Sequence, residues 1–254
     1  YLGARNKKSV SDAVHTSLVI AGILVIVLTI AGIVLSRQLL EWMKTPEEVM
    51  EQAVTYFRLY SAGMFFGIVY NMAAGILNAA GNSKRSLLYL AVASFTNIIL
   101  DILFIAILDM GVAGAAIATD ISQAVSCILS MAFLMRVKDS YQVSLKKLKI
   151  HKNKMFQIFK IGLPAGMQGA IFSISNVLIQ SSVNSFGSVA MAGNAASANI
   201  EGFVYNAMNA VYQTNLSFTS QNMGGKKYTR ITKIMFTCLG TVTAVDAAGQ
   251  SESG

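Results

Sequence analysis

Three polar residues recur at helical spacing inside a stretch of sequence that is otherwise apolar. Ser94, Asn97 and Asp101 lie three and four residues apart within residues 86–108, so a helix would place them on one face. A carboxylate inside a membrane-length helix is costly unless it faces water, a cation or a proton. The spacing therefore predicts that Asp101 and Asn97 belong to a cation-binding or proton-binding site. A structural alternative, a protonated Asp101 bonded to a neighbouring helix, stays open.

A second acid, Glu201, lies in another apolar stretch and has a polar stripe of its own. Tyr205, Asn209 and Tyr212 follow Glu201 at helical spacing on one face. We predict that Glu201 is a second cation or proton site, or holds the positive charge of a substrate, and that Tyr205 and Asn209 line a substrate cavity. The open alternative is a Glu that reaches the membrane surface from a tilted helix.

Further polar stripes predict a wet cavity between the helices. Their amides are those of Asn71, Gln123, Asn176 and Gln180. Amides on packed helices also bond neighbouring helices without binding a ligand, but so many stripes together favour a cavity that holds substrate. Asp120 stands beside Thr119 on a helix that is already polar, and its role stays open.

The composition places these stripes in a membrane. Hydrophobic residues make up 54% of the 254 residues and charged residues 13%, against about 45–50% and about 25% in soluble domains. Several apolar runs approach or exceed the ~18 residues that cross a bilayer, and in lipid such runs must be helices. The predicted fold is an all-α, polytopic transmembrane helix bundle. Its expected spans are residues 13–36, 57–79, 86–108, 112–135, 161–183 and 189–221, with a seventh that begins near Ile231.

Seventeen of the 20 Lys and Arg residues, which give the chain its net charge of +8, lie in four short clusters. These are Arg5, Lys7 and Lys8; Lys84 and Arg85; residues 136–160; and residues 226–233. Basic clusters after every second apolar run are typical of loops that stay in the cytoplasm. We therefore predict a multi-pass protein of the cell (cytoplasmic) membrane with its basic loops facing the cytoplasm. Nucleic acid is not an expected partner, because hairpin loops offer no folded basic face.

The largest basic cluster divides the chain. Residues 1–135 are predicted to be the last four helices of a first lobe, residues 136–160 a cytoplasmic linker, and residues 161–254 the first helices of a second lobe. Pro164 is expected in the first turn of the helix that follows the linker. Residues 1–8 match residues 222–229 at an offset of 221 residues, which predicts two six-helix lobes related by a pseudo-two-fold axis along the membrane normal. The chain is then expected to be truncated at both ends.

Motifs for catalysis are absent from the sequence. It contains no GxSxG, HExxH or P-loop pattern, and neither histidine has a metal-ligating partner at a useful spacing. We therefore predict a protein that is not an enzyme, needs no cofactor and binds no metal other than Na⁺ at Asp101.

Several runs together resemble the multidrug and toxic compound extrusion (MATE) family of efflux transporters. The resemblance covers residues 1 to about 240 and rests on YNMAAGILNAAGNSKRSL, TNIILDILFI, MGVAGAAIATDISQ and KIGLPAGMQGAIFSISNVLIQSSVNSFG. It implies twelve helices in two lobes around a cavity that opens alternately, of which this chain would hold helices three to eight and part of nine. The family's cation or proton site in the first lobe corresponds here to Asn97, Asp101 and Thr119. Residues 161–183 lack the acid that some branches carry on helix seven, and Glu201 is the candidate replacement.

This resemblance predicts a secondary antiporter that exports amphipathic, cationic drugs or toxic metabolites in exchange for H⁺ or Na⁺, and that is monomeric when full length. One alternative is a flippase for lipid-linked precursors of the same superfamily. Its cavity would need basic residues, and Arg58 is the only candidate within a membrane run. The other alternative, an intramembrane enzyme, would require Asp101 and Glu201 to converge.

Overall fold

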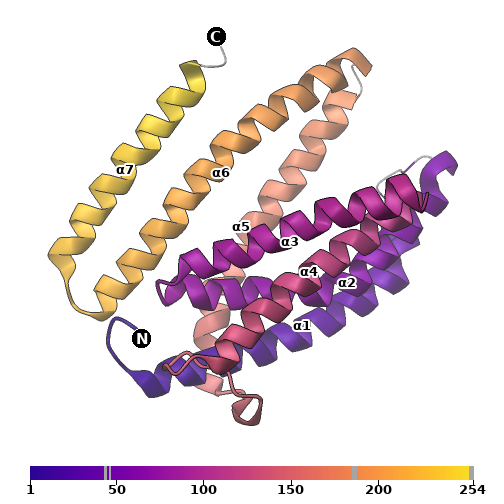
Figure 1. Cartoon of the computed structure of the whole chain (residues 1–254). Helices are drawn as coiled ribbons and strands as arrows, with labels where there is room; N and C mark the ends of the chain where they lie inside the picture. Colours follow the sequence, from indigo (N-terminus) through magenta and orange to yellow (C-terminus); the bar gives the residue numbers. More distant parts are fainter. Residues whose placement is uncertain (43–44, 46, 185–187, 252–254) are drawn as a thin grey trace. The chain divides into compact units, whose positions relative to one another are not determined.

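The computed structural model describes residues 1–42, 45, 47–184 and 188–251, and these residues are helical almost throughout (Figure 1). The elements are α1 (Lys7–Trp42), α2 (Glu47–Ala79), α3 (Ser83–Asp101), the π-helix η1 (Ile102–Ile107), α4 (Gly111–Arg136), the 3₁₀ turn η2 (Leu145–Lys147), α5 (Lys152–Asn184), α6 (Ser188–Gly224) and α7 (Tyr228–Ser251). The predicted all-α fold class is confirmed.

Four helical segments of the described residues are long and apolar enough to cross a membrane. They are Lys7–Trp42, Val49–Ala79, Ser83–Ile107 and Gly111–Arg136. Many of their large apolar side chains are exposed, such as Ile26 and Phe95, which suits helices whose solvent is lipid. The membrane spans predicted within α5, α6 and α7 stay predictions.

The chain divides into two compact units, and the first unit is Lys7–Met155. Within it, α2 packs between α1 and α4, while α3 packs on α4 (Figure 1). Small residues allow these close contacts: the Ser61 side chain of α2 lies over Gly32 of α1, and Gly67 of α2 receives the Gln123 side chain of α4. In lipid the hydrophobic effect does not drive helices together, so they associate through close packing at small residues. At these two crossings the glycines leave room for the polar side chains of Ser61 and Gln123 between the helices.

One local expectation is wrong, and one predicted span is present with a local change of helix geometry. Pro164 does not lie in the first turn of a helix, because α5 begins at Lys152 and runs through it; proline inside a membrane helix is tolerated where the freed carbonyl finds another partner. The span predicted over residues 86–108 is not one uniform α-helix, because it changes to a π-helix after Asp101. Both differences concern backbone geometry that apolar patterning does not encode.

The segment between α4 and α5 is held against the start of α1. The Ser144 N–H donates to His15 Nε2 (3.0 Å), and the His151 N–H donates to Thr16 Oγ1 (3.2 Å). His15 and Thr16 are both buried. The part of the predicted linker that precedes α5 is therefore attached to α1 through Ser144 and His151. The last residues of the predicted linker, from Lys152 on, belong to α5. The predicted division into lobes stays a prediction.

The second unit consists of Tyr1–Asn6 and Phe156–Gly254. It contains the same turn twice, at the two places that the sequence match relates. Arg5 and Lys226 both have a left-handed φ, of 52° and 55°, and each donates its N–H to the carbonyl three residues earlier, on Leu2 (2.9 Å) and Met223 (3.1 Å). This shared geometry supports the internal repeat predicted from the sequence.

These two turns lie against each other, which makes Gly3 sensitive to substitution. A methyl group on Gly3 would overlap the backbone carbonyl of Gln221, so we expect Gly3→Ala to lower the apparent Tm of the full-length protein by several degrees. Gly240→Ala is the matched control, because a Cβ there meets nothing within 4 Å and alanine favours helix. Differential scanning fluorimetry in detergent measures both; equal Tm values for the two variants would contradict the expectation.

Candidate functional site

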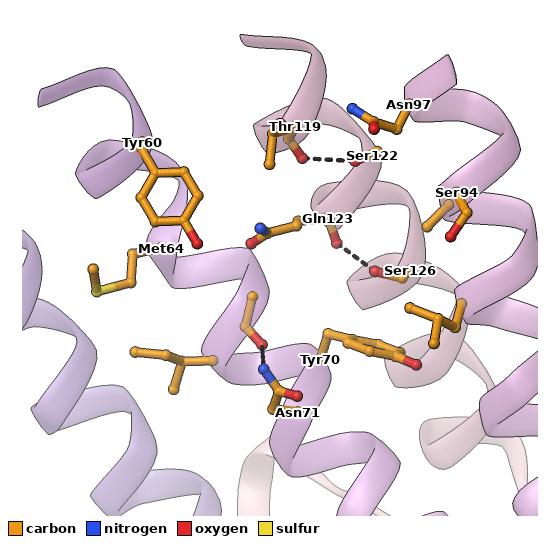
Figure 2. Close-up of a pocket in the computed structure, with 14 residues that line it drawn as sticks. Tyr60, Met64, Tyr70, Asn71, Ser94, Asn97, Thr119, Ser122, Gln123 and Ser126 are labelled. Carbon is orange, nitrogen blue, oxygen red and sulfur yellow. Dashed lines mark hydrogen bonds between the residues drawn. The ribbon is translucent and has the colours of Figure 1, made fainter. Parts of the chain in front are cut away.

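A polar cavity of about 390 Å³ lies among α2, α3 and α4 of the first unit (Figure 2). Its lining residues are Tyr60, Met64, Gly67, Ile68, Tyr70 and Asn71 from α2; Leu90, Ala93, Ser94 and Asn97 from α3; and Thr119, Ser122, Gln123 and Ser126 from α4. None of these fourteen side chains is charged. A cavity of this volume fits a small molecule or part of one.

The hydroxyl groups of α4 present oxygen lone pairs to this cavity. The Thr119, Ser122 and Ser126 hydroxyls each donate to a carbonyl of their own helix: Thr119 to Ala115 (2.9 Å), Ser122 to Thr119 (2.7 Å) and Ser126 to Gln123 (2.9 Å). A hydroxyl whose single proton is used in this way can only accept further hydrogen bonds or ligate a cation. The α4 wall therefore favours hydrogen-bond donors and cations.

Asn97 supplies an unused donor on the opposite wall. Its Nδ2 atom is shielded from solvent and has no hydrogen-bond partner among the described residues. Buried polar atoms are nearly always paired, so an unpaired one in a polar cavity indicates a missing partner such as a ligand, a water or a carboxylate. Tyr70 is fixed nearby by a hydrogen bond from its hydroxyl to the Ser86 carbonyl (3.2 Å), which links α2 to α3.

Asp101 stands beside the cavity and not in its lining. It is half-buried and lies one turn beyond Asn97 on the same face of α3. It is also the last residue of α3 before the π-helix η1. Segments of π-helix widen the backbone and recur at functional sites; here the change falls at the predicted ion-binding carboxylate.

The structure brings four predicted site residues together around one cavity: Asn71, Asn97, Thr119 and Gln123. Asp101 lies beside this cavity in the same unit, and the other five predicted residues belong to the second unit. Among them, Asn176, Glu201, Tyr205 and Asn209 are exposed, and the side chain of Gln180 lies outside the described residues. The predicted roles of all ten residues stay predictions.

Several lining residues were not predicted as site residues. Ser94, Ser122, Ser126 and Tyr60 fall on polar stripes that helical spacing shows, so a pattern for them exists. Met64 and Tyr70 have no such signal, because their place depends on how α2 packs against α3 and α4. Within the ranges that the structure describes, no group of three or more His, Cys, Asp or Glu side chains is placed to hold a metal ion.

Comparisons with known proteins agree with this architecture. The MatE family profile matches residues 1–103. A Bacillus subtilis (strain 168) protein named "Probable multidrug resistance protein YpnP" is 31% identical over 194 residues, which is 76% of this chain and 43% of that protein. Another protein of the same strain, "Probable multidrug resistance protein YoeA", is 26% identical over 240 residues, or 92% of this chain and 52% of that protein.

A solved structure gives the same result for the fold. The crystal structure of a MATE transporter in a bent conformation superposes with a TM-score of 0.87 at 25% sequence identity, over 97% of this chain and 55% of that one. The chain spans about half the length of the relatives that it matches. The chain shares its fold with this transporter, and its sequence matches the two B. subtilis proteins along most of its length. The chain therefore belongs to the multidrug and toxic compound extrusion (MATE) family.

Proposed function

We propose that the full-length protein is a secondary antiporter that exports amphipathic, cationic small molecules in exchange for H⁺ or Na⁺. The observation that carries this proposal is the cavity of the first unit, which is polar, free of basic side chains and adjacent to Asp101. The two B. subtilis relatives are named as multidrug resistance proteins, which supports drug export over chemical conversion of a substrate. On this proposal the protein is a monomer, needs no cofactor and lies in the cytoplasmic membrane with its basic loops inside.

Asp101 is the proposed binding residue for the coupling ion. A carboxylate within a membrane helix is costly while it is charged and unpaired, so a proton or Na⁺ that neutralises it stabilises the conformation in which it is buried. Asn97 can donate its unused N–H to the ionised carboxylate, and the Thr119 hydroxyl can ligate a cation through its free lone pairs. Binding and release of the ion would then bias the transporter between two conformations.

The cavity of the first unit is the proposed site for at least part of the substrate. Its acceptor-rich α4 wall suits ammonium groups that donate hydrogen bonds, and Tyr60 and Tyr70 offer aromatic faces to a cation. Asn71 and Gln123 can orient the substrate through their amides. In the second unit, Tyr205, Asn209, Asn176 and Gln180 are proposed to bind substrate, with Glu201 as a second acid for the ion or the substrate.

The experiment that tests this proposal is dye efflux by the full-length protein in everted membrane vesicles. An imposed proton gradient and an imposed sodium gradient are applied separately, with a fluorescent cationic dye as substrate. We expect transport to follow one of the two gradients and to stop when a matching ionophore dissipates it. If no cationic dye moves under either gradient, the antiport proposal is wrong, and phosphate-bearing lipid-linked substrates become the compounds to assay.

A further inference from the structure

The segment between α4 and α5 carries basic and apolar side chains close together. Its residues 144–151, here called the linker strap, read SLKKLKIH. Its lysines and its apolar side chains are all exposed: Lys146, Lys147, Lys149, Leu145, Leu148 and Ile150. Exposed apolar side chains gain nothing in water, whereas at a membrane surface they enter the lipid and the lysines stay among the headgroups. The composition of the strap therefore suits a place at the edge of the bilayer.

The linker strap has a fixed place at one end of a membrane-length helix. The backbone N–H groups at its two ends donate to His15 Nε2 (3.0 Å) and to Thr16 Oγ1 (3.2 Å) of α1 (Figure 1). Residues 18–35, which follow on α1, contain no charged side chain and are long enough to cross the apolar part of a bilayer. The strap is therefore held where α1 enters the lipid, at the level of the headgroups.

A pocket of about 350 Å³ lies between the linker strap and the start of α1. Its lining is mostly basic and polar, and includes Lys146, Lys147, Lys149, Ser11, Asp12 and His151. Three lysines stand against the carboxylate of Asp12, which already faces His151 (Oδ1 to Nε2, 3.6 Å). Within the part of the chain that the structure describes, none of the three lysines forms an ion pair. The pocket therefore has an excess of positive charge and attracts an anion.

We propose that the linker strap and the start of α1 bind the headgroup phosphate of an anionic phospholipid. Lysine ammonium groups donate hydrogen bonds to phosphate oxygens, and basic segments next to a membrane helix bind anionic lipids. Leu145, Leu148 and Ile150 then insert among the acyl chains. On the proposed topology this lipid belongs to the inner leaflet. The inference goes beyond the proposed antiport, because the lipid is a bound partner of the transporter and not its substrate.

The apolar side chains of the strap favour a lipid over free phosphate as the occupant. Inorganic phosphate would engage the lysines alone and leave Leu145 and Leu148 exposed to water. A phospholipid engages both kinds of side chain at once, and burial of apolar surface adds to its affinity. The two sources of the same phosphate chemistry therefore differ in what they require of the strap.

The test measures binding of dioleoyl phosphatidylglycerol to purified, delipidated full-length protein in an uncharged detergent, by native mass spectrometry. Dioleoyl phosphatidylcholine is the zwitterionic comparison, and wild type should bind it at least about tenfold more weakly. The triple variant Lys146→Gln, Lys147→Gln and Lys149→Gln should weaken the tightest binding of phosphatidylglycerol about tenfold or more. No preference for phosphatidylglycerol in the wild type would overturn the proposal.

A second triple variant removes the same charge elsewhere. Lys227→Gln, Arg230→Gln and Lys233→Gln alter another exposed basic cluster, and this variant should bind phosphatidylglycerol nearly as tightly as the wild type. Equal losses in the two triple variants would show general attraction between charges and no site at the strap. All six substituted side chains are exposed, so each variant should keep the Tm of the wild type.

The choice of lipid over free phosphate is tested with the apolar side chains. Leu145→Gln combined with Leu148→Gln keeps every charge of the strap and should weaken phosphatidylglycerol binding several-fold. A large excess of inorganic phosphate should displace little of the lipid from the wild type. Wild-type affinity in the leucine variant, or ready displacement by inorganic phosphate, would assign the pocket to a free phosphate and overturn the proposal. The dye-efflux result for the antiporter is independent of these outcomes.

Discussion

Replacement of Asp101 with asparagine is expected to reduce gradient-driven dye efflux by the full-length protein at least about tenfold. Asparagine keeps the size and the hydrogen-bonding shape of the side chain but cannot bind a proton or neutralise Na⁺. The helix and its π-helical continuation should therefore form, while the ion no longer biases the two conformations. The measurement is initial efflux rate in everted vesicles at matched protein amounts under the gradient that drives the wild type.

Asp109→Asn is the matched control for this substitution. Asp109 is exposed after η1 and has a left-handed φ of 51°, a conformation that asparagine also adopts. Its variant should retain wild-type transport. Wild-type rates for Asp101→Asn, or equal losses in the two variants, would show that the Asp101 carboxylate does not bind the coupling ion.

Replacement of His15 with alanine should have the largest effect on stability. His15 is 2% exposed, and both ring nitrogens are bonded: Nδ1 donates to the Ser11 carbonyl (2.7 Å), and Nε2 accepts from the Ser144 N–H (3.0 Å). The variant leaves a cavity and a buried N–H without its acceptor, which together cost about 3 kcal/mol. The segment that follows α4 should also become accessible to protease, which limited proteolysis of the purified protein measures.

A second histidine on the same segment provides the control. His151 keeps 37% of its side chain exposed, and its Nε2 lies 3.6 Å from Asp12 Oδ1, so a partly exposed pair of this kind contributes less than about 1 kcal/mol. His151→Ala should leave both Tm and proteolysis nearly unchanged. His15→Gln should recover part of the loss, since its amide oxygen can accept from Ser144. An equal effect of the two alanine variants would contradict the attachment of this segment to α1 through His15.

The sequence predicts the helices well because lipid leaves few choices. Apolar runs of sufficient length must be helices, and helical spacing then determines that Asn97 and Asp101 share a face. The same reasoning selected Asn71 and Gln123, which the structure places around one cavity with Thr119. Thr119 was assigned through the family resemblance and not through spacing, because polar side chains occur on several sides of α4.

Spacing within one helix does not show which faces of different helices meet. The close contacts of Gly63 with Asp120 and of Gly67 with Gln123 follow from the crossing of α2 and α4, so the surroundings of Asp120 were not predictable. The run ILFIAI, which forms the π-helix, is uniformly apolar and contains no proline or glycine to mark a change. Pro164 was misplaced for a related reason, because the rule for helix starts describes helices in water better than helices in lipid.

The most direct test of the account is the release of the coupling ion when purified full-length protein binds a cationic dye. Protons are followed with a pH indicator in weak buffer, and sodium with a radioactive tracer on protein loaded beforehand. We predict that wild type releases one of the two ions on dye binding and that Asp101→Asn releases neither. Release from Asp101→Asn equal to that of the wild type would contradict the assignment of the coupling site to Asp101.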